Sequence, residues 1–176
     1  MADLDFADFN SMVRAHQKQI HRLILAMVRD PDDADALTQD TFVKAFEHRK
    51  SFRKESAIGT WLTRIAINQV RDHERSRRWR FWQGLVRKPR DSNAPDPVEK
   101  VADKAADPAR ILEARDNTET LWAVVANLSV RQRAAFTLRF VEEMSLEAIA
   151  NAMGCEVGTV KSHLARALAT IRREVP

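Results

Sequence analysis

The stretch from Ser145 to Leu164, SLEAIANAMGCEVGTVKSHL, predicts two short helices joined by a tight turn. Ala150 is small where the two helices would cross closely, and Gly154 can adopt the left-handed conformation that ends the first helix. Val160 is placed to pack the second helix back against the first. This spacing predicts a helix-turn-helix, whose second helix can enter the major groove of DNA.

The second helix of this motif begins with small, polar and basic residues. Those expected to face DNA are Gly158, Thr159, Lys161, Ser162, Ala165 and Arg166. The two basic side chains can reach phosphates or guanine edges, while the hydroxyl groups and the first backbone amides can bind phosphates. An ordinary helical hairpin with a solvated basic face is the alternative, and the combined Ala, Gly and Val spacing favours DNA binding over it.

Upstream of this motif, apolar residues recur at three- and four-residue steps, which predicts further helices. Three are expected, from Phe6 to Arg29, from within Asp32–Asp35 to His48, and from Thr60 to Trp82, with a loop from Ser51 to Gly59. The 176 residues include only four glycines and six prolines, and strand patterns are nearly absent. The predicted fold class is therefore all-α.

The third of these helices carries polar residues along one side. Arg64, Asn68, Arg71, Arg75 and Arg78 follow one another at steps of four, three, four and three residues. Such steps align side chains on one helical face, so these five residues form a continuous basic track. An apolar stripe that includes Trp61 lies on the other side, and we interpret this tryptophan as a core residue rather than a base-stacking one.

Helical periodicity fades from Gln83 to Asn117, where four prolines lie among charged and small residues. The sequence therefore predicts two small helical domains, residues 6–82 and 118–176, joined by a flexible linker at residues 83–117. One short helix is expected in the linker, near Ala109 to Arg115. Four helices are expected in the second domain, with a capping box formed by Ser129 and Gln132 and a helix cap at Ser145.

Several other classes of protein are disfavoured by the residues present. Cys155 has no second cysteine for a disulfide or a metal site, and the five histidines lack metal-ligand spacing. No phosphate-binding loop or nucleophile with a nearby base appears, so no cofactor, metal or enzyme activity is expected. Met1 to Asn10 is acidic rather than signal-like, and no apolar run is long enough for a membrane span. We expect a cytoplasmic protein without membrane insertion.

These segments resemble a known family, the sigma factors of bacterial RNA polymerase. The stretches Leu128 to Arg133, Ser145 to Ala150 and Gly158 to Ser162 resemble the family's fourth conserved region. Asp33 to Phe42 resembles its polymerase-binding segment, and Thr60 to Asn68 resembles its promoter-melting helix. The segments occur in family order and the extra domains of housekeeping members are lacking, so the resemblance is to the extracytoplasmic-function group.

The resemblance implies two partners, promoter DNA and the clamp and flap of RNA polymerase core. The second helix would bind the clamp of the largest polymerase subunit through Asp35, Gln39, Asp40 and Glu47. Ala36 departs from the family pattern, in which an acidic residue is usual at this position.

For promoter DNA, the resemblance implies a division between the two domains. The C-terminal motif would read the minus-thirty-five element as duplex. Ser56 and Ala57 lie in the loop that would capture a base flipped out of the minus-ten element, and the basic track would hold the melted strand.

The resemblance also implies control by an anti-sigma factor. A stand-alone helix-turn-helix regulator, binding an operator as a symmetric dimer, is the alternative function. The run from Arg77 to Trp82 alternates arginine with aromatic residues, and either contact with nucleic acid or anchoring of the linker would suit it.

Overall fold

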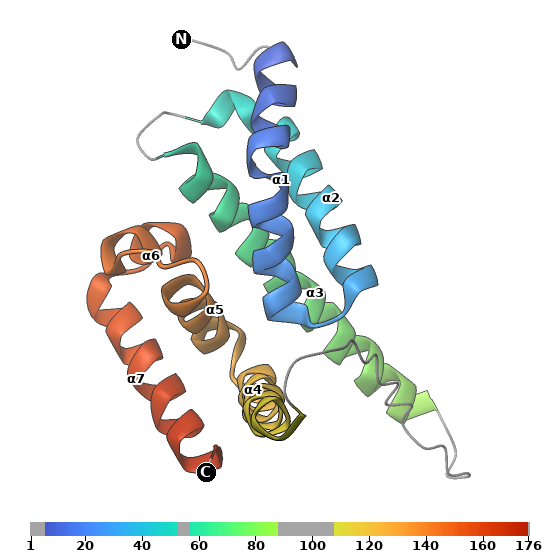
Figure 1. Ribbon diagram of the computed structural model, residues 1–176. Coiled ribbons are helices and arrows are strands. Elements are labelled where there is room, and N and C mark those ends of the chain that lie inside the picture. The colour runs from blue at the N-terminus through green and yellow to red at the C-terminus, as the bar shows by residue number, and fades with distance from the viewer. Residues whose placement is uncertain (1–5, 53–56, 88–107, 176) are drawn as a thin grey trace.

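The computed structural model of the protein describes residues 6–52, 57–87 and 108–175. Regular elements in these ranges occur in the order α1 (Phe6–Val28), α2 (Pro31–Glu47), the short 3-10 helix η1 (Arg49–Ser51), α3 (Ile58–Arg87), α4 (Pro108–Asn127), α5 (Val130–Phe140), α6 (Leu146–Met153) and α7 (Val157–Glu174) (Figure 1). The described ranges contain no strand, which confirms the all-α class. None of their helices combines the length and the apolar character that crossing a membrane requires.

Three consecutive residues build the corner between α1 and α2. Arg29 ends α1 in the left-handed region, with a φ of 59°. Asp30 caps α2, its carboxylate accepting a hydrogen bond from the backbone N–H of Asp33 at 3.0 Å. Pro31 takes the first helical position. A backbone N–H there has no partner within the helix, so proline loses no hydrogen bond. Because Asp30 is the cap, α2 begins one residue before the range predicted for its start.

The N-terminal domain, α1 to α3, packs around an apolar core. Its buried side chains include Ile20, Leu23, Ile24, Met27, Leu37, Ala45, Leu62, Ala66 and Val70. Burying one leucine or isoleucine contributes about 2 kcal/mol to folding, so this core holds the three helices together. Trp61 is half-buried against it, with its ring 5.1 Å from the ring of Phe52, which agrees with a core role.

Helices α3 and α4 are both longer than predicted. The third helix was expected to end at Trp82, where apolar periodicity fades, but α3 continues to Arg87 because the first strong helix breaker is Pro89. The short helix expected at Ala109 to Arg115 continues to Asn127, since no proline or glycine interrupts it. The remainder of the predicted linker, residues 88–107, lies outside the described residues.

The C-terminal domain, α4 to α7, contains both predicted helix caps. At the start of α5, the Ser129 hydroxyl accepts a hydrogen bond from the Gln132 N–H at 3.4 Å, and the Gln132 side chain accepts one from the Ser129 N–H at 3.3 Å. Ser145 caps α6 by accepting a hydrogen bond from the Ala148 N–H at 3.1 Å. The capping box and the second cap are therefore confirmed.

The two domains pack against each other, with α6 beside α3 and α5 beside α1 (Figure 1). Leu138, Ile149 and Val160 of the C-terminal domain are fully buried and belong to the same apolar cluster as the core of α1 to α3. A smaller cluster around Val125 and Phe136 joins α4, α5 and α7. The sequence predicted two domains joined by a flexible linker, whereas the larger apolar cluster of the structure continues across the domain boundary.

Candidate nucleic-acid interface

The helix-turn-helix is formed by α6 and α7. Gly154 ends α6 in the left-handed conformation, with φ 62° and ψ 43°, and donates its N–H to the carbonyls of Ala150 and Asn151. Ala150 and Val160 are 6% and 0% exposed, so the small residue and the packing residue lie where the motif requires them. Cys155 is a half-buried residue of the turn. The predicted geometry is confirmed.

The start of α7 is open to solvent, as a DNA-reading helix requires. Of the six candidates, Gly158, Lys161, Ser162, Ala165 and Arg166 are exposed, and Thr159 is half-buried. The Ser162 hydroxyl donates a hydrogen bond to the Gly158 carbonyl at 3.0 Å, so it must rotate before it can donate to a phosphate.

Helix α7 also has an electrostatic bias toward anions at its start. Its N-cap residue, Glu156, makes no side-chain cap bond, which leaves first-turn amides available to a phosphate. Lys161 and Arg166 form no ion pair with any described residue. On the next turn, partial burial and then the charges of Arg131 and Arg166 lower the pKa of His163 below its ordinary value.

The basic track on α3 is exposed along its whole length. Arg64, Asn68, Arg71, Arg75 and Arg78 all lie on the surface of one helical face, as predicted. Asp72 partly neutralises the middle of the track, with a carboxylate oxygen 3.7 Å from Arg71 and 3.5 Å from Arg75. The face keeps a net positive charge, because its four arginines outnumber this one carboxylate.

The N-terminal half of the track faces the C-terminal domain, a contact that no local sequence pattern predicts. The Arg64 guanidinium donates to the backbone carbonyl of Asn151 and, at 2.9 Å, to its side-chain oxygen. Asn68 and Arg71 line a small cavity together with Cys155 and His163. Arg64 is therefore hydrogen-bonded to α6, whereas Asn68 and Arg71 border the gap between α3 and the helix-turn-helix and stay exposed.

The predicted base-capture loop is described only in part. Ser56 lies outside the described residues, and Ala57 is exposed immediately before α3. Of the aromatic residues in the run Arg77 to Trp82, only Trp79 has a described side chain, and it is 64% exposed. An exposed tryptophan among arginines suits contact with a nucleic-acid base or with another protein surface.

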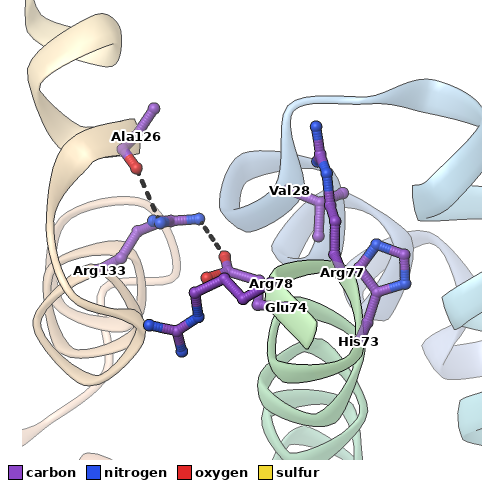
Figure 2. Close-up of a pocket in the computed structure, with 7 residues that line it drawn as sticks. All are labelled: Val28, His73, Glu74, Arg77, Arg78, Ala126 and Arg133. Atoms are coloured by element: carbon purple, nitrogen blue, oxygen red, sulfur yellow. Dashed lines mark hydrogen bonds and ion pairs between the residues drawn. The ribbon is translucent and has the colours of Figure 1, made fainter. Parts of the chain in front are cut away.

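A groove of about 420 Å³ separates the far end of α3 from α4 and α5. Figure 2 shows its lining, in which Arg77 and Arg78 project from α3 beside Glu74, and Glu74 turns toward Arg133. The groove is basic at its mouth, because Glu74 is already paired with Arg133 at 2.6 Å.

The exposed face of α2 carries the predicted polymerase contacts. Gln39 and Asp40 are exposed, Asp35 lies 2.9 Å from His21, and Glu47 lies 3.5 Å from Lys44. Val43 shares the face of Asp40 and Glu47 at helical spacing and is 57% exposed. Val43 was not among the predicted contacts, although its sequence signal is an apolar residue out of step with the buried positions of α2.

No group of three or more histidine, cysteine or acidic side chains in the described ranges is placed to hold a metal ion. The arrangement is one of exposed donors and positive charge, suited to binding a polyanion.

Comparisons with known proteins agree with this arrangement. Residues 12–80 match sigma-70 region 2, and residues 118–171 match sigma-70 region 4. The RNA polymerase sigma-H factor of Pseudomonas aeruginosa is 35% identical over 165 residues, which cover 90% of this chain and 81% of that protein. The ECF RNA polymerase sigma factor SigM of Mycobacterium tuberculosis is 33% identical, over 94% of this chain and 76% of that protein.

Solved structures show the same fold. The sigma factor RpoE in complex with the anti-sigma factor NepR, from Bartonella quintana, has a TM-score of 0.67 at 25% identity and matches 94% of this chain and 95% of its own. CnrH in complex with the cytosolic domain of CnrY has a TM-score of 0.62 at 22% identity, over 96% and 88% of the two chains. From the two region matches in family order and from relatives aligned over nine tenths of its length, the chain belongs to the sigma-70 family, in the extracytoplasmic-function (ECF) group of RNA polymerase sigma factors.

Proposed function

We propose that the protein binds RNA polymerase core and directs it to specific promoters, as a non-catalytic initiation factor. The observation that carries this proposal is the start of α7, which is exposed, basic and without a side-chain cap, in a chain of the ECF group. Such a helix start binds phosphate and reads base edges but offers no group placed for catalysis.

In this proposal α7 reads the minus-thirty-five element as duplex. Lys161 and Arg166 contact phosphates or guanines, Thr159 and Ser162 contact phosphates, and Gly158 and Ala165 allow the close approach of the DNA backbone. Lys161 and Arg166 are exposed and have no ion-pair partner among the described residues. This supports the assignment, because neither side chain must first give up an ion pair.

The minus-ten element is bound by α3 as a melted strand. Arg64, Asn68 and Arg71 supply the contacts nearest the base-capture loop, where Ser56 and Ala57 lie, and Arg75 and Arg78 extend the backbone contacts. The alignment of the five track residues on one exposed face supports this role.

Helix α2 binds the clamp of the largest polymerase subunit. Gln39 and Asp40 are the central contacts, Asp35 and Glu47 flank them, and Val43 adds an apolar contact at the middle of the face. An exposed apolar residue surrounded by polar ones is typical of a protein interface.

An anti-sigma factor holds the protein inactive. RpoE and CnrH, whose folds this chain shares, were both solved as complexes, the first with an anti-sigma factor and the second with the cytosolic domain of CnrY. The alternative of a stand-alone regulator has no comparable support, because the relatives that align over nine tenths of the chain are sigma factors.

Co-elution with purified bacterial core RNA polymerase tests the proposal. The wild type is expected to elute with core, and the double variant Gln39→Ala with Asp40→Ala is expected to bind about tenfold more weakly. A matched double variant, Gln17→Ala with Lys18→Ala, removes an amide and a charge from the exposed side of α1 and should elute like the wild type. A wild type that fails to bind core would refute the proposal.

A further inference from the structure

The groove between the far end of α3 and helices α4 and α5 carries an excess of positive charge. Its described lining holds three guanidinium groups, from Arg77, Arg78 and Arg133, against the single carboxylate of Glu74. The volume of about 420 Å³ lies within the range of small-molecule sites, about 300 to 1,000 Å³. None of the polymerase or promoter contacts proposed above uses Arg77 or Arg133.

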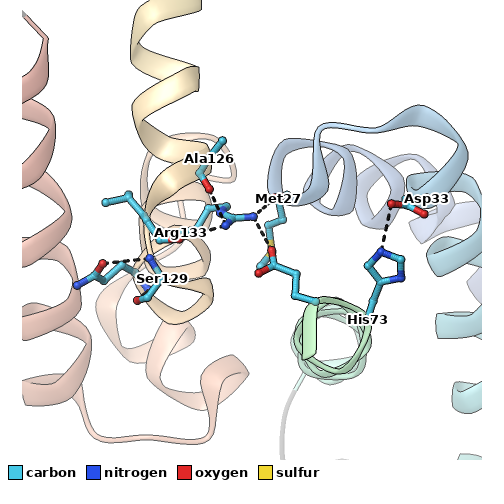
Figure 3. Close-up of polar contacts among 9 residues, drawn as sticks. Met27, Asp33, His73, Ala126, Ser129 and Arg133 are labelled. Atoms are coloured by element: carbon cyan, nitrogen blue, oxygen red, sulfur yellow. Dashed lines mark hydrogen bonds and ion pairs between the residues drawn. The ribbon is translucent and has the colours of Figure 1, made fainter. Parts of the chain in front are cut away.

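Arg133 forms one wall of the groove and keeps one donor unused. The residue is 7% exposed, and its two terminal nitrogens make four hydrogen bonds (Figure 3). Their acceptors are the Met27 carbonyl at 2.5 Å, the Glu74 carboxylate at 2.6 Å, the Ala126 carbonyl at 2.7 Å and the Leu128 carbonyl at 3.1 Å. The fifth donor, the Nε–H, is buried and has no partner among the described residues. A buried donor without a partner is costly, so an anionic oxygen that reaches it binds more favourably than at an exposed donor.

The carboxylates nearest the groove already have partners. Glu74 is paired with Arg133, which removes most of its repulsion toward an incoming anion. Asp33 lies 3.1 Å from the ring of His73, on the side of α3 away from Arg133 (Figure 3). The groove therefore has no carboxylate in its described lining that is free to repel an anion.

Arg77 and Arg78 supply the charge that remains uncompensated. Both are exposed and neither forms an ion pair with a described residue. Figure 2 shows their guanidinium groups diverging from α3. A single phosphate can pair with one such group, whereas a ligand that engages both needs several anionic oxygens along its length. Arginine suits this task, because its planar guanidinium binds phosphate oxygens in pairs.

We propose that this groove binds a small polyphosphate, either free or as the triphosphate group of a nucleotide. Arg77 and Arg78 hold the phosphate chain and Arg133 lies beneath it. The inference is independent of the proposed function, because binding is a property of the free chain without polymerase or promoter. A nucleic-acid strand is the competing polyanion, but a strand that follows the exposed face of α3 has no need of the wall that α4 supplies.

Two substitutions test the two sides of the groove separately. Arg77→Ala removes a cation of α3, and Arg14→Ala is its matched control, because Arg14 is exposed on α1 and forms no ion pair with a described residue. Ala126→Glu places a carboxylate on the wall formed by α4. Asn127→Glu adds the same charge at the next residue, which is exposed and outside the lining.

Isothermal titration calorimetry of the full-length chain with sodium tripolyphosphate, at a fixed salt concentration of about 0.15 M, measures the binding. The wild type is expected to bind at a single site. Arg77→Ala and Ala126→Glu should each weaken the affinity about tenfold, as expected for one charge-assisted contact, and the two controls should stay within about twofold of the wild type. Adenosine triphosphate in a parallel titration distinguishes the source: tighter binding than tripolyphosphate identifies a nucleotide, and weaker binding identifies the free phosphate chain.

A wild type that binds neither probe at millimolar concentration would overturn the inference. Equal losses in the groove variants and their controls would also overturn it, because they would indicate general attraction between a basic chain and a polyanion. A loss in Arg77→Ala without one in Ala126→Glu would place the anion on the open surface of α3, as for a nucleic-acid backbone, and would equally contradict the groove. None of these results bears on co-elution with core polymerase, so the proposed function stands or falls separately.

Discussion

Gly154 sets the angle between α6 and α7 through its backbone alone. Its φ of 62° lies in the left-handed region, and nothing lies within 4 Å of the position that a Cβ would take. The cost of a side chain there is therefore conformational rather than steric. Residues other than glycine adopt this region at a cost of about 1 kcal/mol.

Gly154→Ala is expected to lower the free energy of unfolding by about 1 kcal/mol, measured by urea denaturation. Gly158→Ala is the matched control, because an added Cβ there also meets nothing within 4 Å and Gly158 lies inside α7. Alanine favours a helix over glycine, so this variant should be as stable as the wild type or more so. Equal losses at both positions would contradict the role assigned to the left-handed turn.

His163 couples the helix-turn-helix to pH. Its pKa is lowered in the folded chain, first by burial and then by Arg131 and Arg166, so the unfolded chain binds a proton more readily than the folded one. The free energy of unfolding therefore decreases as the pH falls through the ordinary histidine pKa of about 6.5. Well above that pH, His163 has no effect on it.

The melting temperature should consequently fall between about pH 7.5 and about pH 5.5, and His163→Gln should fall less over the same window. The difference between the two curves isolates His163 from the other titrating groups. Identical pH dependence in the two proteins would show that the surroundings of His163 do not lower its pKa.

At the scale of the helical elements, the capping of helix ends contributes to stability alongside the packing of buried faces. The capping box of α5 satisfies two backbone N–H groups, those of Ser129 and Gln132, that the helix cannot satisfy internally. Ser129→Ala is expected to lower the free energy of unfolding by about 1 kcal/mol. Ser76→Ala, on the exposed side of α3, should cost nothing in the same urea titration, because alanine is the better helix former.

Helix α7 carries a prediction about DNA. Lys161→Ala in the reconstituted holoenzyme should weaken promoter binding by about 1 kcal/mol or more and flatten the dependence of affinity on salt, because one phosphate or guanine contact is lost. Lys18→Ala removes the same charge from α1 and should leave both unchanged. Equal losses in the two variants would indicate a general effect of charge rather than a contact made by α7.

Much of the element structure was predictable, and the errors have physical causes. Regular apolar steps located α1, and Ser145, Ser129 and Gly154 marked ends that the structure confirms. Helix α3 passes Trp82 because helices do not end where apolar periodicity fades, but where a breaker such as Pro89 stops them. Asp30 was overlooked as the cap of α2 because three further acids follow it within five residues.

For the candidate site, the sequence predicted which residues share a face but not what covers that face. Spacing along one helix placed the basic track and the start of α7 correctly on exposed surfaces. The contact of Arg64 with Asn151 spans 87 residues of sequence, and no local pattern encodes such a pairing. The buried position of Arg133 was equally hidden, since arginine in a helix is usually on the surface.

At the scale of the whole molecule, the two domains share one apolar cluster and leave two of the predicted binding surfaces exposed. The start of α7 and the Gln39 and Asp40 face of α2 lie open to solvent, whereas Arg64 of α3 is hydrogen-bonded to Asn151 of α6.

Promoter-directed transcription measures whether this chain gives RNA polymerase its choice of promoter. Core polymerase would transcribe fragmented genomic DNA of the source bacterium with and without the purified protein, and the transcript starts would be mapped by sequencing. We expect a small set of starts that depend on the protein, each preceded by shared minus-ten and minus-thirty-five sequences. Starts that are the same with and without the protein would contradict it.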